Sequence, residues 1–305
     1  MFSLKDSRML TEAAIFDKLK LYKIYGVNMI NILNAGNEKV ADGLLITVLS
    51  IIKHTNEPIN MVCFTMDLTD IDTRFTPISS KFAEYVDKIL KEKNPESEFT
   101  LMDLTSLFKK ELINSVNLGT GFTPYTMLRL LADEVPEIKG KFIYLDTDVI
   151  INNDISELFN IDISNYEIAC VKDIYNWASP SRWGTKNYFN AGVLLLNIDK
   201  IRETGYFKKA RHLVNTKKML YCDQDALNKT VTSKLMLPVK FNAKDKYFPE
   251  IVVHHFCNVR KKGNFFKRIK PWEVELVKTR THAYDDILDD YLARKQRGDW
   301  SYPPQ

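Results

Sequence analysis

The chain contains little cysteine, and its cysteines are not spaced for a metal ribbon or a disulfide scaffold. Only four occur in 305 residues, and none belongs to a Cys-x-x-Cys pair. This distribution argues against a zinc ribbon and against a fold that depends on disulfides. We therefore expect reduced thiols and a cytoplasmic protein. The four residues are Cys63, Cys170, Cys222 and Cys257.

Long apolar runs and linkers are missing as well. No stretch approaches the roughly 20 apolar residues of a membrane-spanning helix. The first thirty residues carry charges throughout, which argues against a secretory leader. There is no internal repeat, low-complexity tract or linker rich in glycine or proline, so the sequence predicts one main domain.

Strand-like and helix-like segments alternate along the chain, and a hydrophobic content of 45% is enough for a large core. Residues 29–33 predict a first strand, the apolar positions between Leu44 and Ile52 a helix, and residues 61–65 a second strand, which together make a βαβ unit. The fold class is therefore α/β. Later strands are expected near 101–104, 142–145, 167–171 and 193–196, and a long amphipathic helix near 199–218.

Two aspartates follow directly after an apolar run. Residues 142–145 read Phe-Ile-Tyr-Leu, and Asp146-Thr147-Asp148 come next. A buried strand of an open α/β sheet presents the residues after it at the edge where ligands bind. Two carboxylates there can share magnesium or manganese, which relieves their mutual repulsion. Two alternatives stay open: an ordinary turn or helix cap, and the dyad of a haloacid-dehalogenase-like phosphohydrolase, with Asp146 as nucleophile and Asp148 as acid.

Other polar residues stand at helix starts or strand ends. Arg129 lies among leucines in the helix expected after Thr123-Pro124, where an arginine usually faces water or a carboxylate. Residues 223–225, Asp-Gln-Asp, open a helix, and capping alone could explain either acid. His254 and His255 alternate in a strand, so their side chains lie on opposite faces, and we expect His254 to be structural.

The basic residues are concentrated in one place. Residues 258–270 contain six lysines and arginines and no acid, although the formal net charge of the whole chain is only +4. This favours a local site for phosphates, an acidic acceptor or an anionic membrane surface over a coat for nucleic acid. A solvated basic loop explains the charges equally well.

The pieces and their order closely resemble glycosyltransferase family eight, from about Met29 to Trp272. That family includes the glycogenins and the bacterial lipopolysaccharide galactosyl- and glucosyltransferases. Any one piece is weak evidence, whereas several in the same order are strong. The pieces are residues 32–52, Tyr144-Leu145-Asp146-Thr147-Asp148, Phe189-Asn190-Ala191-Gly192-Val193-Leu194-Leu195, Asp223-Gln224-Asp225, His255-Phe256-Cys257 and Lys270-Pro271-Trp272.

The resemblance implies an A-type glycosyltransferase fold, a mixed and mostly parallel sheet flanked by helices with a Rossmann-like nucleotide-binding half. It also implies a retaining enzyme that uses manganese or magnesium. The donor is a UDP-sugar, UDP-glucose or UDP-galactose, and the acceptor a glycan, glycolipid or protein. We expect residues 1–28 to be a dispensable helical extension, residues 29–272 the catalytic domain and residues 273–305 a C-terminal helical tail.

The resemblance also carries over roles for individual residues. Asp146, Asp148 and His255 match the metal ligands. Lys270 matches a lysine on the donor diphosphate. The other donor contacts are Ala35, Asn37, Arg129 and Thr147, and the residues that hold or face the transferred sugar are Asp173, Asn190, Asp223 and Gln224.

The sequence departs from the family pattern in two places. Asn37, Glu38 and Val40 stand where acids and an aromatic often bind uracil, which leaves the donor base open. Residues 258–269 form a longer segment than in compact members, suited to a basic lid over the diphosphate or to a docking patch, including peripheral contact with an anionic membrane. Two other functions remain, the phosphohydrolase and a catalytically inactive nucleotide-sugar-binding or membrane-docking subunit. An amide is a poor nucleophile, so we favour same-face attack over a covalent intermediate on Gln224 or a nearby aspartate.

Overall fold

The structure is a computed structural model, and it describes residues 29–119, 123–173, 185, 187–244, 246–257, 259–262 and 265–300. For 259–262 and 265–268 only the backbone is described. The predicted N-terminal extension, residues 1–28, therefore lies outside the described residues.

Seven strands of the described chain form one sheet in the order β3-β2-β1-β4-β7-β6-β8. The sheet is mostly parallel, because only β7 runs against both of its neighbours, β4 and β6. The inner strands are buried on both faces, which explains their continuous apolar sequences. The strands are β1 (Ile30–Ala35), β2 (Ile59–Thr65), β3 (Glu98–Asp103), β4 (Lys141–Leu145), β6 (Ile168–Lys172), β7 (Phe189–Asn197) and β8 (Lys234–Leu237).

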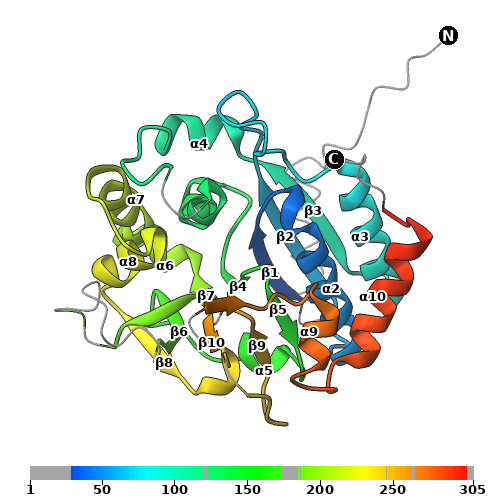
Figure 1. The fold of residues 1–305 in the computed structure, drawn as a ribbon. Helices are drawn as coiled ribbons and strands as arrows, with labels where there is room; N and C mark the ends of the chain where they lie inside the picture. The colour runs from blue at the N-terminus through cyan, green and yellow to red at the C-terminus, as the bar shows by residue number, and fades with distance from the viewer. Residues whose placement is uncertain are drawn as a thin grey trace.

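Helices cover both faces of the sheet (Figure 1). One apolar core lies under α2, α3, α5, α9 and α10, and a second lies under α4, η2, α6, α7 and α8 on the other face. These elements are η1 (Glu38–Val40), α2 (Ala41–His54), α3 (Ser80–Lys93), α4 (Thr105–Glu111), η2 (Pro124–Glu134), α5 (Ser156–Phe159), α6 (Ile198–Thr204), α7 (Tyr206–Thr216), α8 (Cys222–Thr230), η4 (Val239–Phe241), α9 (Val274–Lys278) and α10 (Asp285–Arg297).

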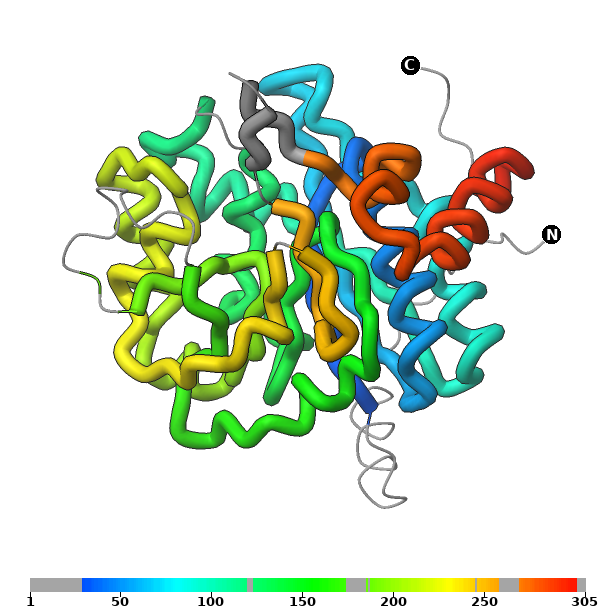
Figure 2. The backbone as a smooth tube through the Cα atoms, turned by 60° about the horizontal axis from the view of Figure 1, so that its bottom comes forward, coloured from blue at the N-terminus to red at the C-terminus, as the bar shows by residue number. Residues whose placement is uncertain are grey.

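Two short strand pairs stand apart from the main sheet. β5 (Val149–Ile151) pairs antiparallel with β9 (Val253–His255), and Val149 lies opposite His255. Figure 2 shows these segments, far apart in the chain, running side by side. β10 (Val259–Lys262) and β11 (Phe265–Arg268) form an antiparallel hairpin. The β5–β9 pair is the contact that brings the histidine beside the acid pair.

The structure differs from the sequence prediction in three elements. The long helix expected at 199–218 is two helices, α6 and α7, because Gly205 takes a left-handed backbone with φ of 66° that ends the first. The helix after Thr123-Pro124 is a 3₁₀ helix, η2. β7 begins at Phe189, four residues before the expected strand, so Asn190 belongs to the sheet.

The C-terminal segment packs onto the main core. In α10, Ile287, Leu288 and Tyr291 are buried in the same apolar cluster as α2, and Trp300 stacks on Tyr85 of α3 with ring centroids 5.4 Å apart. Within the described ranges, no helix combines the length and the apolar character needed to cross a membrane.

Candidate active site

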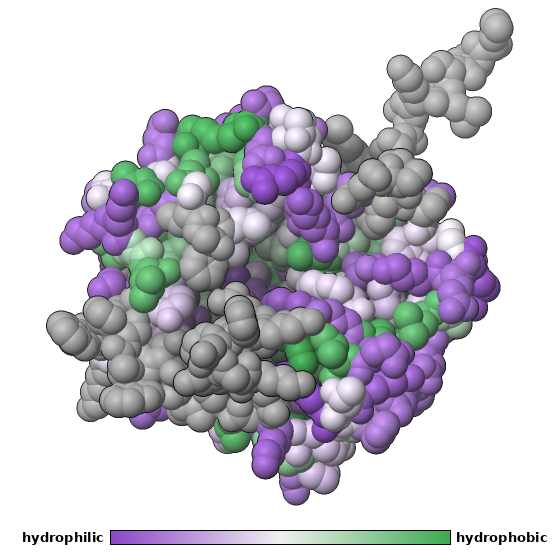
Figure 3. Space-filling model, in the orientation of Figure 1, coloured by the Kyte–Doolittle hydropathy of each residue, from purple (hydrophilic) through white to green (hydrophobic). Residues whose placement is uncertain are grey.

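The site lies at the edge of the sheet where β1 and β4 end and the reversed strand β7 begins. The Asp146 N–H donates to the Gly192 carbonyl at 2.8 Å, so the acid pair and the Asn-Ala-Gly segment are adjacent. A cavity of about 1020 Å³ opens there, and Figure 3 shows the hollow in this face. Every residue that the sequence assigned to the site lines this cavity: Ala35, Asn37, Arg129, Asp146, Thr147, Asp148, Asp173, Asn190, Asp223, Gln224, His255 and Lys270.

Asp146, Asp148 and His255 form a group that fits a divalent cation. One potential ligand atom from each lies within 4.8 Å of the others. His255 Nε2 is 3.2 Å from Asp148 Oδ1 and 3.8 Å from Asp146 Oδ2. This nitrogen is buried and has no hydrogen-bond partner among the described residues. Carboxylate oxygens and one imidazole suit manganese, and magnesium to a lesser degree, so the three side chains fit the metal that the family implies.

Positive charge balances Asp148 within the protein. Burial would raise the pKa of the Asp148 carboxyl, but His255 and Lys270 lower it well below its usual range. Burial would lower the pKa of His255, yet contacts with Cys257 and Asp148 raise it to about 10. The Lys270 ammonium forms an ion pair with the second oxygen of Asp148. A divalent cation would take over this balancing role and displace the proton of His255.

Arg129 connects four elements beneath the acid pair. Its guanidinium lies 2.8 Å from Asp146 Oδ1 and 3.1 Å from Asp223 Oδ2. It also donates to the Ala191 carbonyl and lies over the Tyr144 ring, 4.2 Å from the centroid. Burial raises the pKa of Asp223 to about 6, although the Arg129 charge acts in the opposite direction. The arginine thus faces carboxylates, one of the two surroundings expected from its leucine-flanked sequence.

At the other end of the cavity, both the oxygen and the nitrogen of the Gln224 side chain are held by hydrogen bonds. Its Oε1 accepts from Asn190 Nδ2 at 3.0 Å and from the Ala191 N–H at 3.1 Å. Its Nε2 donates to the Tyr188 hydroxyl at 3.2 Å and to Asp173 Oδ2 at 3.4 Å. The backbone N–H of Ala191 can only donate, so it fixes which end of the amide is oxygen.

Several side chains at the site were assigned no role from the sequence. Lys244 is buried 3.2 Å from Asp173 Oδ1, and Asn242 lies between His255 and Asn190. Both stand in the loop after η4, outside any motif. Tyr144 donates to Asp146 Oδ1 at 3.1 Å; its place in the apolar run suggested only core packing. His254 points away from the cavity and is 2.8 Å from the Tyr284 hydroxyl, in line with the structural role expected for it.

Gly43 explains why the acid pair and the Lys-Pro-Trp segment lie close together. A Cβ at this position of α2 would collide with the Thr147 carbonyl and would lie 2.5 Å from the Trp272 ring. The helix therefore packs directly against the loop that contains both acids. Only glycine permits this approach.

The basic segment is a hairpin at the rim of the same cavity. Its two strands, β10 and β11, lie between Cys257 and Lys270, which both line the cavity. The proposed roles as lid or docking patch depend on side chains outside the described part of the chain, so both stay predictions.

The fold and the site together define an A-type glycosyltransferase. The evidence is the mostly parallel sheet with one reversed strand, the acid pair after its central strand and the facing histidine. The sequence model of glycosyl transferase family 8 matches residues 25–273, and the chain belongs to that family. The chain is thus an enzyme, a glycosyltransferase, and the dehalogenase-like phosphohydrolase alternative is wrong.

Known relatives agree with this assignment. A provisionally named glycosyltransferase of Haemophilus influenzae is 30% identical over 256 residues, 76% of this chain and 72% of that protein. The lipopolysaccharide 1,2-glucosyltransferase of Escherichia coli is 30% identical over 113 residues, 33% of each chain. The crystal structure of the galactosyltransferase LgtC, solved with donor and acceptor sugar analogs, superposes with a TM-score of 0.66 at 21% identity, over 89% of this chain and 100% of that one. At that identity the superposition shows a shared fold.

Proposed function

We propose that this glycosyltransferase is a metal-dependent, retaining hexosyltransferase whose donor is UDP-glucose or UDP-galactose. The acceptor is a glycan, a glycolipid or a protein. The observation that carries the proposal is the arrangement in one cavity of Asp146, Asp148 and His255, whose Nε2 faces both carboxylates, next to Lys270 and Gln224. The glucosyl- and galactosyltransferase names of two similar proteins support a hexose donor.

One end of the cavity holds the proposed cation ligands and Lys270, and the other end holds the carboxylate and amide groups of Asp173, Asn190 and Gln224. Cleavage of the bond between the anomeric carbon and the diphosphate puts negative charge on the departing oxygen. A bound divalent cation supplies Lewis-acid stabilisation of that charge. The Lys270 ammonium, which pairs with Asp148, adds a further positive charge that can stabilise the departing diphosphate. The carboxylates of Asp173 and Asp223 are suited to orient the hexose, which develops positive charge.

Hydrogen bonding at Gln224 favours attack on the same face of the sugar that the diphosphate leaves. Both lone-pair directions of its Oε1 are already used by Asn190 and the Ala191 N–H, so this oxygen is poorly placed as a nucleophile. In same-face transfer, the acceptor oxygen bonds to the anomeric carbon while the bond from that carbon to the diphosphate oxygen breaks. The diphosphate oxygen keeps the bonding electrons and takes the proton of the acceptor hydroxyl.

A donor panel tests the proposed activity. The protein is incubated with Mn²⁺ and with UDP-glucose, UDP-galactose or other UDP-sugars, and released UDP is measured. We expect slow, Mn²⁺-dependent hydrolysis of one UDP-hexose without an acceptor, since water can replace the acceptor hydroxyl. Binding of donor without turnover would support the inactive subunit instead, and the absence of metal-dependent binding would overturn the proposal.

Mass spectrometry tests the same-face mechanism. We expect the intact protein to show no covalent glycosyl adduct after rapid quenching with the turned-over donor, either for the wild type or for Gln224→Glu. The variant supplies a carboxylate, which is a better nucleophile than an amide, so it is the stricter sample. A wild-type adduct mapped by peptide digestion to Gln224, Asp223 or Asp225 would defeat the mechanism while leaving the donor assignment intact.

A further inference from the structure

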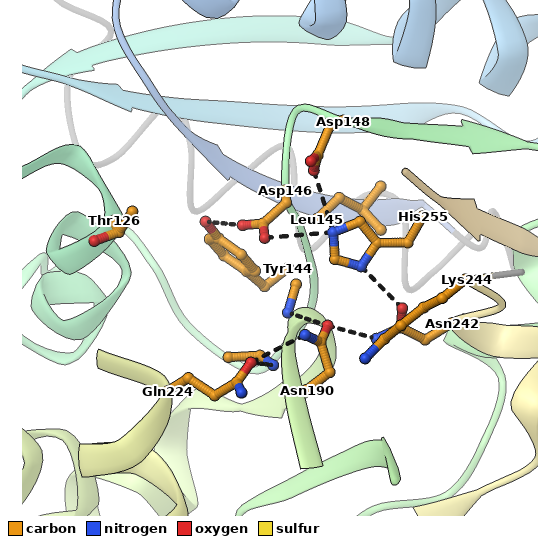
Figure 4. Close-up of polar contacts among 12 residues, drawn as sticks. Thr126, Tyr144, Leu145, Asp146, Asp148, Asn190, Gln224, Asn242, Lys244 and His255 are labelled. Carbon is orange, nitrogen blue, oxygen red and sulfur yellow. Dashed lines mark hydrogen bonds and ion pairs between the residues drawn. The ribbon is translucent and has the colours of Figure 1, made fainter. Parts of the chain in front are cut away.

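Asn242 lies between the proposed metal site and the opposite end of the cavity, where Asn190 and Gln224 lie and where the transferred sugar is proposed to bind. Asn242 follows directly after η4 and is only 1% exposed. Asn242 Oδ1 is 3.0 Å from His255 Nδ1, and Asn242 Nδ2 donates to Asn190 Oδ1 at 3.0 Å. Figure 4 shows His255 with one edge of its ring toward the acids and the other toward Asn242. One small amide thus contacts a residue of each half of the site.

The sheet backbone fixes the direction of these hydrogen bonds. The Gly192 N–H donates to Asn190 Oδ1 at 3.0 Å, and the Ala191 N–H donates to Gln224 Oε1 at 3.1 Å. A backbone N–H can only donate, so both accepting atoms must be oxygens. Asn190 then presents Nδ2 to Gln224 and Oδ1 to Asn242. The orientation of Asn190 is therefore set by β7 and does not depend on any titratable group.

The direction continues through Asn242 to the histidine. Because Asn190 offers an oxygen, Asn242 must present Nδ2 to it and Oδ1 to His255. An amide oxygen can only accept, so His255 Nδ1 carries a hydrogen. In the neutral ring the lone pair then sits on Nε2, the atom 3.2 Å from Asp148 Oδ1 and 3.8 Å from Asp146 Oδ2. A metal ligand of this kind needs a nitrogen without a proton.

We propose that Asn242 is a positioning residue that holds His255 in the Nδ1–H tautomer and so prepares Nε2 to bind the divalent cation. The proposal rests on the metal site proposed above and deepens it. The Gly192 N–H of β7 fixes the orientation of the Asn190 amide. Asn190 in turn fixes Asn242, whose Oδ1 accepts a hydrogen bond from His255 Nδ1. Asn190 also donates to Gln224 Oε1, so the tautomer of His255 and the orientation of Gln224 belong to one hydrogen-bonded chain.

Two substitutions separate the two contacts of Asn242. Asn242→Leu removes both hydrogen bonds at similar volume. Asn242→Asp keeps an acceptor for His255 Nδ1 but presents a second oxygen to Asn190 Oδ1. It should therefore disturb the contact with Asn190 and leave the contact with His255 in place. We expect Asn242→Leu to weaken Mn²⁺ binding by about 10- to 100-fold, the usual effect of removing such a partner. We expect Asn242→Asp to bind Mn²⁺ at least as tightly as the wild type, with a raised KM for the donor.

The experiment is a calorimetric titration of the full chain with Mn²⁺ alone, combined with ¹⁵N NMR of histidine in the Mg²⁺-loaded protein. The NMR spectrum reports which ring nitrogen of His255 is protonated, a property that general destabilisation does not change. Asn117→Leu is the matched control, because Asn117 is similarly buried but donates to the backbone carbonyls of Val214, in the last turn of α7, and Lys217, just after it. We expect it to lower the melting temperature without altering Mn²⁺ affinity, and a melting curve is recorded for each variant.

The possible outcomes distinguish this inference from the proposed function. If wild-type protein binds Mn²⁺ and Asn242→Leu binds it equally well, Asn242 has no positioning role and the metal site stands. A wild-type NMR spectrum with the hydrogen on Nε2 overturns the inference and removes His255 from the ligands, whereas cation binding by Asp146 and Asp148 can still stand. If the wild type does not bind Mn²⁺ at all, the proposed metal dependence fails and this inference fails with it. Weakened binding by Asn242→Leu, rescued in Asn242→Asp, supports it.

Discussion

Asp148→Asn is expected to lower kcat/KM with the turned-over UDP-hexose and Mn²⁺ by about 100- to 1000-fold, which corresponds to roughly 3 to 4 kcal/mol of transition-state stabilisation. Asp148 is buried, faces His255 and Lys270, and is one of three side chains that can hold the cation. An amide keeps the shape of the side chain but loses the charge that attracts a divalent cation. The loss should appear both as weaker Mn²⁺ affinity and as a lower kcat at saturating Mn²⁺.

The control for this prediction is Asp162→Asn. Asp162 is an exposed aspartate that accepts the Ser164 N–H in a loop away from the cavity, so the same chemical change there should leave Mn²⁺ affinity and turnover unaltered. Circular dichroism checks that both variants fold. Wild-type turnover by a folded Asp148→Asn protein, still dependent on Mn²⁺, would show that the cation binds elsewhere.

Gly192→Ala should damage the same site without replacing any of the three proposed metal ligands. A Cβ on Gly192 would collide with the His255 ring at Cε1 and would lie 2.6 Å from Asp146 Oδ2. Neither neighbour can move away freely, because His255 is held by Asn242 and Asp146 by Arg129. We expect Mn²⁺ affinity to fall by more than about 10-fold, in proportion to the displaced ligands, and stability to fall by about 1 to 3 kcal/mol from overpacking.

Gly140→Ala separates these two effects. Gly140 has φ of 73°, and nothing lies within 4 Å of a Cβ there. Alanine should therefore cost about 1 to 2 kcal/mol of stability through its strained backbone, while Mn²⁺ affinity and turnover stay at the wild-type level. The measurements are urea unfolding and a Mn²⁺ titration of both variants. Undiminished Mn²⁺ affinity in Gly192→Ala would mean that His255 and Asp146 do not bind the cation from their observed positions.

The acid pair could be located from the sequence because two local signals coincide there. An apolar run marks a buried strand, and a strand of an open sheet ends at the edge where ligands collect. Asp146 and Asp148 were therefore expected at a sheet edge before any partner was known. The A-type fold and the family are confirmed, and the residues assigned through the resemblance meet in one cavity. Their individual roles stay predictions until the substitutions are made.

The residues that the sequence did not reveal act through contacts distant in the chain. Asn242 and Lys244 stand in a loop, and their neighbours in sequence say nothing about His255 or Asp173, which they contact in space. The break between α6 and α7 was also missed. A single glycine is tolerated in a helix, and only the left-handed backbone of Gly205 ends it here.

The pairing of β5 with β9 has a consequence for folding. It joins residues more than a hundred positions apart in the chain, so Asp148 and His255 lie side by side only in the folded chain. Any cation or donor that binds both halves therefore binds the native state and not the unfolded chain, and its binding free energy adds to native stability. A ligand at 100 times its Kd contributes about 2.7 kcal/mol. A bound donor or cation would then raise the free energy of unfolding of the whole protein, in addition to its part in the reaction.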